Sequence, residues 1–177
     1  WVIALITALS IPNASAVPSS AEELLNTLAV KGRAPKTGYT RAQFGSTWAD
    51  VNKNGCDTRN DILKRDLTNI VFRAKTHDCV VESGTLIDPY SGDTINFVKG
   101  VTSSMDVQID HVVALSNAWQ TGAFKVTLEK RTALANDPDN LLAVQGRLNS
   151  QKGDGDAATW LPRGPRSSSP SSTGSRL

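Results

Sequence analysis

Asp110 and His111 are adjacent residues whose side chains suit metal-assisted hydrolysis. A carboxylate is a hard anionic oxygen ligand for a divalent cation, and an imidazole titrates near neutrality and can accept a proton from water. Hydrolysis of a phosphodiester needs both groups, because a cation neutralises the developing negative charge and a base activates the attacking water. The pair therefore indicates a metal-dependent hydrolytic centre.

The segments around this pair predict how it is held. Apolar and polar residues alternate over 105–109, which predicts a half-buried strand that runs directly into Asp110 and His111. Adjacent residues on a strand point to opposite faces, so both can serve one site only if the strand bends or ends there. The apolar run 141–144 predicts a second strand, and 147–152 predicts a short helix that stops at Gly153. The expected order is strand, long connection, strand, helix.

Three segments in this order resemble the parts of an HNH, or ββα-metal, nuclease motif: 109–115, 140–144 and 149–154. Further segments resemble secreted bacterial and fungal HNH-family proteins, whose domain is related to one at the C-terminal end of GmrSD-type restriction enzymes: 56–60, 118–123, 136–137 and 160–162. The resemblance extends from about Gly38 to Pro162. It implies an α+β fold with a small ββα-metal (HNH/His-Me finger) core, additional N-terminal helices and a short antiparallel hairpin.

The resemblance also implies roles for four residues. Asp110 matches the acid that binds the metal, His111 the general base, Asn140 the middle asparagine that holds the metal loop, and Asn149 the helix residue that completes the metal site. The implied activity is endonucleolytic hydrolysis of nucleic acid by one divalent ion, and we expect the substrate to be DNA and not RNA. We expect Mg²⁺ with Mn²⁺ as a substitute, since both accept oxygen ligands.

Two cationic residues are candidates for substrate binding. Lys152 follows Asn149 by three residues, on the same helical face, and would reach a phosphate oxygen. Arg59 would clamp a phosphate with its paired donors. The alternatives stay open: both charges are solvated, Asn140 is a turn residue, and Asp110 and His111 are structural.

A second candidate metal site lies in the segment Asp50, Asn52, Asn54, Gly55, which matches the start of a calcium loop. Asp61 stands where the closing carboxylate of such a loop would be. The alternative is a turn stabilised by Asp and Asn side chains without an ion. Beyond this loop, the apolar spacing from Asp61 predicts an amphipathic helix to about Arg73, and 79–101 predicts a small antiparallel hairpin.

The ends and the cysteines indicate the compartment. Residues 1–16 are uncharged, mostly apolar and end in Ala-Ser-Ala, which predicts a secretory signal peptide that lacks its beginning here. A buried terminal helix is the alternative. Cys56 and Cys79 predict one disulfide bond in an oxidising compartment. We therefore expect an extracellular protein that does not span a membrane.

Length and composition limit the number of domains that the chain can form. The 177 residues, 39% of them hydrophobic, suffice for one core and predict a monomeric nuclease domain over 38–162. Residues 17–37 predict a helix and linker, and 163–177 predict a disordered tail, for which a frameshift is one explanation. The net charge of +2 depends on arginines in that tail, so it does not by itself indicate a nucleic-acid partner. The rival prediction is a catalytically inactive secreted module held by the disulfide and stabilised by calcium.

Overall fold

The computed structural model describes residues 20–162 and 164, so the predicted signal peptide and nearly all of the predicted tail lie outside the described residues. The chain divides into two compact units, 1–32 and 33–177. In the first, α1 (Ala21–Thr27) is the short helix predicted near the N-terminus. It begins with a capping box, in which the Ser20 hydroxyl accepts from the Glu23 amide and the Glu23 carboxylate accepts from the Ser20 amide.

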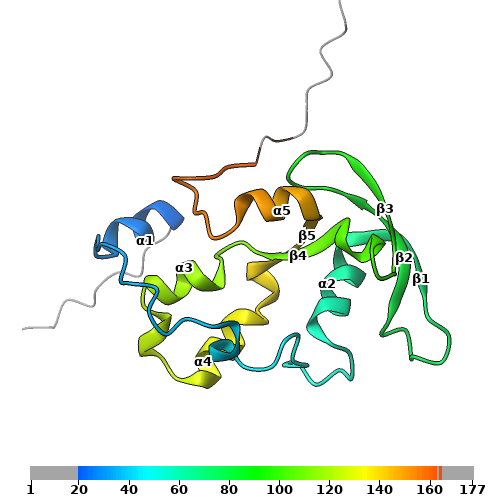
Figure 1. Ribbon diagram of the computed structural model, residues 1–177, viewed down its shortest axis with the longest axis horizontal. Helices are drawn as coiled ribbons and strands as arrows, with labels where there is room; N and C mark the ends of the chain where they lie inside the picture. The colour runs from blue at the N-terminus through cyan, green and yellow to red at the C-terminus, as the bar shows by residue number, and fades with distance from the viewer. Residues whose placement is uncertain (1–19, 163, 165–177) are drawn as a thin grey trace, which may run out of the picture. The chain divides into compact units, whose positions relative to one another are not determined.

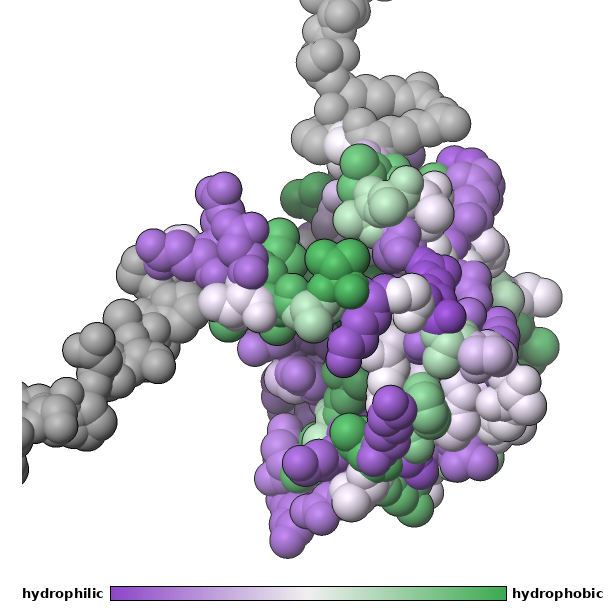
Figure 2. Space-filling view, turned by 90° about the vertical axis from the view of Figure 1, so that its left-hand side faces the viewer, coloured by the Kyte–Doolittle hydropathy of each residue, from purple (hydrophilic) through white to green (hydrophobic). Residues whose placement is uncertain are grey.

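The second unit is the α+β fold that the sequence predicts (Figure 1). Hydrophilic and hydrophobic residues are interleaved over the face of the molecule seen in Figure 2. Its elements, in chain order, are η1 (Arg41–Phe44), α2 (Thr58–Asp66), β1 (Leu67–Phe72), β2 (Val81–Ile87), β3 (Thr94–Val98), η2 (Ser103–Met105), β4 (Val107–His111), α3 (Leu115–Gln120), η3 (Ala123–Lys125), α4 (Leu128–Ala135), η4 (Pro138–Asn140), β5 (Leu141–Gln145) and α5 (Gly146–Lys152). Among residues 20–162 and 164, no helix is long and apolar enough to cross a membrane.

The helix predicted from Asp61 to Arg73 is wrong in its second half. It ends at Asp66, and the next six residues form β1, which pairs antiparallel with β2. The apolar spacing fits a helix there, but the segment Leu67–Phe72 is rich in β-branched and aromatic residues and finds a partner strand. A bulge between Thr68 and Val71, with Asn69 at φ 51°, adapts the strand to that partner.

The predicted hairpin is present as β2 and β3, which complete a three-stranded antiparallel sheet with β1. Asp88 organises the turn between them, because one carboxylate oxygen accepts hydrogen bonds from the amide and hydroxyl of Ser91. Its other oxygen accepts from the Gln145 amide at the end of β5. This bond ties the turn, and the Tyr90 that it carries, to the second sheet.

The second sheet has the predicted order of strand, connection, strand and helix. β4 and β5 pair antiparallel with His111 opposite Leu141, and α5 follows β5 at once and contacts both strands (Figure 1). The connection contains α3, η3 and α4. α2 lies between the two sheets and contributes Ile62 and Leu63 to the core that they share.

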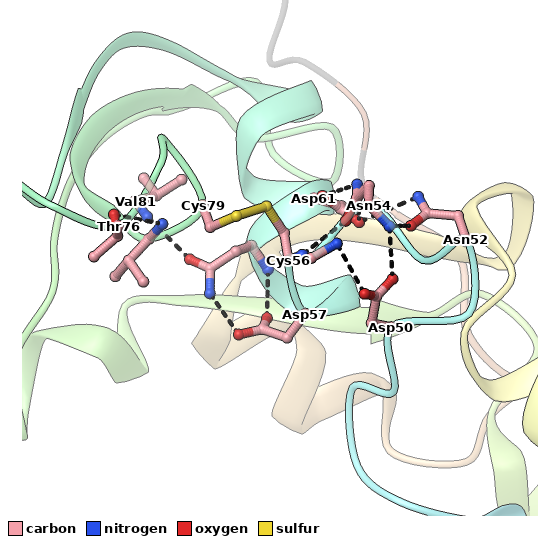
Figure 3. Close-up of a disulfide and its surroundings, with 12 residues drawn as sticks. Asp50, Asn52, Asn54, Cys56, Asp57, Asp61, Thr76, Cys79 and Val81 are labelled. Atoms are coloured by element: carbon pink, nitrogen blue, oxygen red, sulfur yellow. Dashed lines mark hydrogen bonds between the residues drawn. A yellow bond between two sulfur atoms is a disulfide. The ribbon is translucent and has the colours of Figure 1, made fainter.

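Two smaller clusters and a disulfide complete the packing. Trp119 packs with Phe44, Leu115 and neighbours from α3 and α4, while Trp160 packs edge-on against Tyr90. The disulfide between Cys56 and Cys79, predicted from the sequence, joins the start of α2 to the β1–β2 connection (Figure 3). Closing a loop of this size stabilises the fold by about 3 kcal/mol in the chain-entropy account.

Candidate active site

Asp110, His111 and Asn149 line one cleft of about 430 Å³, which we call the β4–α5 cleft. Its rim comes from α3, from the segment after α5 and from the extended segment before η1. The other lining residues are Lys36, Tyr39, Arg41, Ile109, Ala114, Leu115, Ser116, Gly153 and Asp154. The structure thus brings together the three residues that the sequence analysis assigned to metal binding and base catalysis.

Asp110 and His111 share this cleft because β4 ends at His111. Asn140 holds the chain just beyond that point: its side-chain oxygen accepts from the Val113 amide at 2.8 Å, and its side-chain nitrogen donates to the Val113 carbonyl at 3.3 Å. The Asn140 backbone carbonyl also accepts from the Val112 amide. Asn140 therefore lies where it fixes the loop after the strand, without lining the cleft itself.

Asp110 is buried, and each of its carboxylate oxygens accepts one hydrogen bond. Oδ2 accepts from the Tyr90 hydroxyl, and Oδ1 accepts from the Lys152 ammonium at 3.0 Å. Burial, and secondarily the hydrogen bond to Asp110, raises the pKa of Tyr90 well above its usual value, so the hydroxyl keeps its proton. A carboxylate oxygen has two lone pairs, and each oxygen of Asp110 can still bind another ligand.

Lys152, which the sequence analysis predicted to reach a phosphate oxygen, with a solvated charge as the alternative, is buried. Its side chain is 5% exposed, and Nζ donates to Asp110 and, at 2.8 Å, to the backbone carbonyl of His111. The ammonium faces inward because the buried Asp110 carboxylate needs a compensating charge. Lys152 therefore ties the end of α5 to the end of β4, and its charge is not free to extend to a phosphate in solution.

His111 is oriented by the carbonyl of Ala135, which lies 2.9 Å from Nε2. A carbonyl oxygen only accepts, so Nε2 carries the hydrogen and Nδ1 of the neutral ring carries a lone pair. Burial lowers the pKa of His111, which keeps the imidazole neutral at pH 7 and able to accept a proton. The ring of Trp48 stacks on it with a centroid distance of 5.9 Å and an interplanar angle of 14°.

Asn149 lies on α5 and presents its side-chain oxygen as a possible ligand. Its Nδ2 donates to Oε1 of Gln108 at 2.8 Å, which occupies the nitrogen and orients the amide. α5 can begin this close to the end of η2, which leads into β4, only because its first residue is a glycine. A Cβ on Gly146 would lie 1.9 Å from the Met105 carbonyl oxygen.

The donor atoms fit a partly hydrated Mg²⁺ better than a fully protein-bound metal. Within the described part of the chain, no group of three or more His, Cys, Asp and Glu side chains is arranged to hold a metal ion. The β4–α5 cleft is lined by two carboxylates, Asp110 and Asp154, and by the Asn149 amide, and Asp154 already accepts hydrogen bonds from Ser116 and Lys36. Mg²⁺ commonly binds proteins through one or two such oxygens and completes its shell with water and phosphate. Asp110 and Asn149 would be its ligands.

Asp154 is a rim residue that the sequence analysis did not single out. Its Oδ2 accepts from the Ser116 hydroxyl at 2.7 Å and from the Lys36 ammonium at 3.2 Å. The hydrogen bond from Ser116, followed by that from Lys36, lowers the pKa of Asp154. Arg41, Trp48 and Tyr90 were missed as well, because nothing in their sequence spacing marks them as neighbours of β4.

Arg59, the predicted phosphate clamp, lies outside this cleft. It lines a separate pocket next to β4, with Nη2 at 3.5 Å from the Val107 carbonyl oxygen. Burial lowers the pKa of its guanidinium. The side chain is therefore partly desolvated and beside the strand that carries Asp110 and His111.

The calcium-like loop is closed by its own hydrogen bonds (Figure 3). Asp50 accepts from the amides of Asn54 and Gly55, and the Asn54 side-chain nitrogen donates to both carboxylate oxygens of Asp61. The Asn54 side-chain oxygen accepts from the Cys56 amide at 2.8 Å. Asn54 thus turns its nitrogen, not its oxygen, toward Asp61, and this donor set fits an Asx-stabilised turn better than a calcium ion.

Comparison with known proteins finds the family that the segments 109–115, 140–144 and 149–154 resemble. The model of the C-terminal domain of GmrSD restriction endonucleases matches residues 57–163. A protein of Arthroderma benhamiae described as an uncharacterized secreted protein is 38% identical over 165 residues, which cover 91% of this chain and 76% of the relative. No solved structure matches the chain.

Proposed function

Because the chain belongs to the family of GmrSD restriction endonuclease C-terminal domains, we propose that it is a secreted, metal-dependent endonuclease of the HNH type. The family supports a nuclease, and the name of the fungal relative together with the disulfide supports secretion. The substrate would be nucleic acid, with DNA preferred over RNA, and the enzyme would act as a monomer.

The observation that carries this proposal is the position of three groups in one cleft: the Asp110 carboxylate, the Asn149 amide and the His111 imidazole. A divalent ion held by the two oxygen ligands would supply positive charge for the phosphate and the leaving 3′ oxygen.

His111 would act as the base through Nδ1. A water oxygen attacks phosphorus and its proton passes to Nδ1, while the bond from phosphorus to the 3′ oxygen breaks and that oxygen takes a proton from solvent. The products are then a 5′-phosphate and a 3′-hydroxyl end. The Ala135 carbonyl holds Nε2–H and thereby keeps the ring oriented, and it stabilises the imidazolium that forms.

Tyr90 and Lys152 would orient Asp110, because each donates a hydrogen bond to one of its carboxylate oxygens. Residues that hydrogen-bond a metal ligand set its orientation, and losing one commonly weakens metal affinity or activity ten- to hundredfold. Asn140 would act more indirectly, by holding the loop that follows His111.

The buried Lys152 also favours a second candidate function. Its positive charge lies 3.0 Å from the proposed metal ligand and would weaken cation binding there. An inactive secreted module held by the disulfide is consistent with that arrangement. A protein that folds normally but does not hydrolyse nucleic acid when a divalent metal ion is added would favour this alternative.

A plasmid-degradation assay with and without EDTA tests the proposal. Wild-type protein should degrade DNA only with Mg²⁺ or Mn²⁺, and His111→Ala should lose activity at least a hundredfold. The chain contains one other histidine, His77, which is exposed and outside the cleft, so His77→Ala is the matched control and should cleave normally. Equal activity in wild type and His111→Ala would exclude the assigned base.

A further inference from the structure

A second pocket, of about 310 Å³, lies directly beside the candidate active site, and we call it the side pocket. Trp48 lines both this pocket and the small cavity that contains His111. Gln108 also lines it and accepts the hydrogen bond from Asn149, which lines the β4–α5 cleft. Gln108 and His111 are three residues apart on β4, a separation of about 10 Å. The side pocket therefore lies close enough to the centre for one nucleic-acid strand to reach both.

The walls of the side pocket combine an apolar floor with positive charge. Buried Phe97, Leu63 and Val81 lie at its base, and the half-buried Trp48 ring forms part of the wall. One face of the Trp48 ring stacks on His111, so a flat ring would stack on the other face, and such stacking accepts any of the bases.

Arg59 and Lys99 supply the charge, and none of the described residues that line the side pocket is acidic. Arg59 makes no ion pair within the described residues, and its guanidinium donates a long hydrogen bond, of 3.5 Å, to the Val107 carbonyl. Burial lowers the pKa of this guanidinium, and the negative charge of Asp57 acts in the opposite direction. Two cations on a pocket wall that has no acidic lining residue are complementary to phosphate groups.

We propose that the side pocket binds one unstacked nucleobase of a single-stranded segment, next to the phosphate that is cleaved, while Arg59 and Lys99 contact the flanking phosphates. This proposal rests on the proposed function and names its substrate class. A base inside a duplex keeps both faces stacked on its neighbours, so it enters such a pocket only from a single strand or after leaving the duplex.

The Ser104 hydroxyl at the rim supports a polar ring edge as the ligand. Its oxygen accepts from the Gly100 amide, which leaves its hydrogen available to donate. The aromatic ring would stack on the face of a base, the hydroxyl would donate to its edge, and the cations would contact the phosphates of the same strand.

Binding can be measured without cleavage by fluorescence anisotropy in EDTA. The probes are a short labelled single-stranded DNA, the same strand with abasic sites, and the corresponding duplex. The wild-type protein should bind the intact strand about tenfold more tightly than the abasic strand, because stacking of a base contributes at this level. Binding to the duplex should be weaker than to the intact strand.

Charge variants test the cations. Arg59→Gln and Lys99→Glu should each weaken binding of the intact strand about tenfold, whereas Lys130→Glu, an exposed lysine outside the pocket, should change it less than threefold. Circular dichroism of each variant verifies folding.

Equal affinity for intact and abasic strands, or equal effects of Lys99→Glu and Lys130→Glu, would overturn the proposal. The two proposals fail separately. If the protein binds the intact strand more tightly than the abasic strand but never cleaves either, the base-binding pocket is supported and the nuclease activity is excluded. If the protein cleaves DNA with a metal ion but binds the intact and abasic strands equally, the nuclease activity is supported and the base-binding pocket is excluded.

Discussion

The ammonium of Lys152 lies 3.0 Å from a carboxylate oxygen of Asp110, and both side chains are about 95% buried. The same ammonium donates to the backbone carbonyl of His111. One side chain of α5 therefore fixes both members of the pair on β4. This relation makes Lys152 an internal support of the candidate site.

Replacing Lys152 by methionine should destabilise the protein by about 3–5 kcal/mol, because a buried carboxylate is left without its compensating charge. Urea denaturation of the variant measures the free energy of unfolding. Lys130→Met, at an exposed position, is the control and should change it by less than about 0.5 kcal/mol.

The double variant Lys152→Met with Asp110→Asn should recover part of the loss, since the uncompensated charge is then removed as well. A Lys152→Met variant as stable as the Lys130→Met control would show that the ion pair does not hold this site.

Tyr90→Phe should reduce activity roughly ten- to hundredfold by removing the hydroxyl that orients Asp110. The ring and its edge-on packing against Trp160 remain, so the fold should be kept. Steady-state cleavage over a range of Mg²⁺ concentrations should show that the half-saturating concentration rises. A lower maximal rate with unchanged Mg²⁺ dependence would mean that Tyr90 does not act through the metal ligand.

Gly146→Ala should destabilise the protein by about 1–3 kcal/mol or more, because the added Cβ would overlap the Met105 carbonyl and push α5 away from β4. Thermal unfolding is the measurement. Gly32→Ala, where nothing lies within 4 Å of the added Cβ, is the control. Equal melting temperatures for the two variants would contradict the close approach of α5.

Calcium should raise the melting temperature no more than the same concentration of magnesium does. The physical reason is that Asp50, Asn54 and Asp61 already satisfy one another and the loop amides. Thermal-shift titrations with each ion, on wild type and Asp61→Asn, make the measurement. A calcium-specific rise that Asp61→Asn abolishes would establish the calcium loop instead.

The sequence predicted the parts of the structure that depend on local pattern. The alternation before Asp110, the apolar run before Gln145 and the stop at Gly153 mark β4, β5 and α5, and the spacing within them places Asp110, His111 and Asn149 in one cleft. Strand pairing then fixes their relative position, because β4 and β5 are adjacent and α5 follows directly.

Features that depend on distant contacts could not be predicted. The segment after Asp66 has helical spacing and becomes β1 because β2 pairs with it. Tyr90 is 20 residues from Asp110 and reaches it only because the Asp88 turn binds the end of β5. The inward direction of Lys152 likewise follows from the burial of its partner, which no residue spacing reveals.

The account depends most on Asp110 and Asn149 binding one divalent ion beside His111, and Mn²⁺ binding followed by electron paramagnetic resonance tests this directly. Wild-type protein should bind Mn²⁺, and Asp110→Asn and Asn149→Ala should each weaken the affinity at least tenfold. Asp93→Asn, an exposed control on the β2–β3 turn, should bind as wild type does. Mn²⁺ affinity that is absent in the wild type, or unchanged in both cleft variants, would contradict the account.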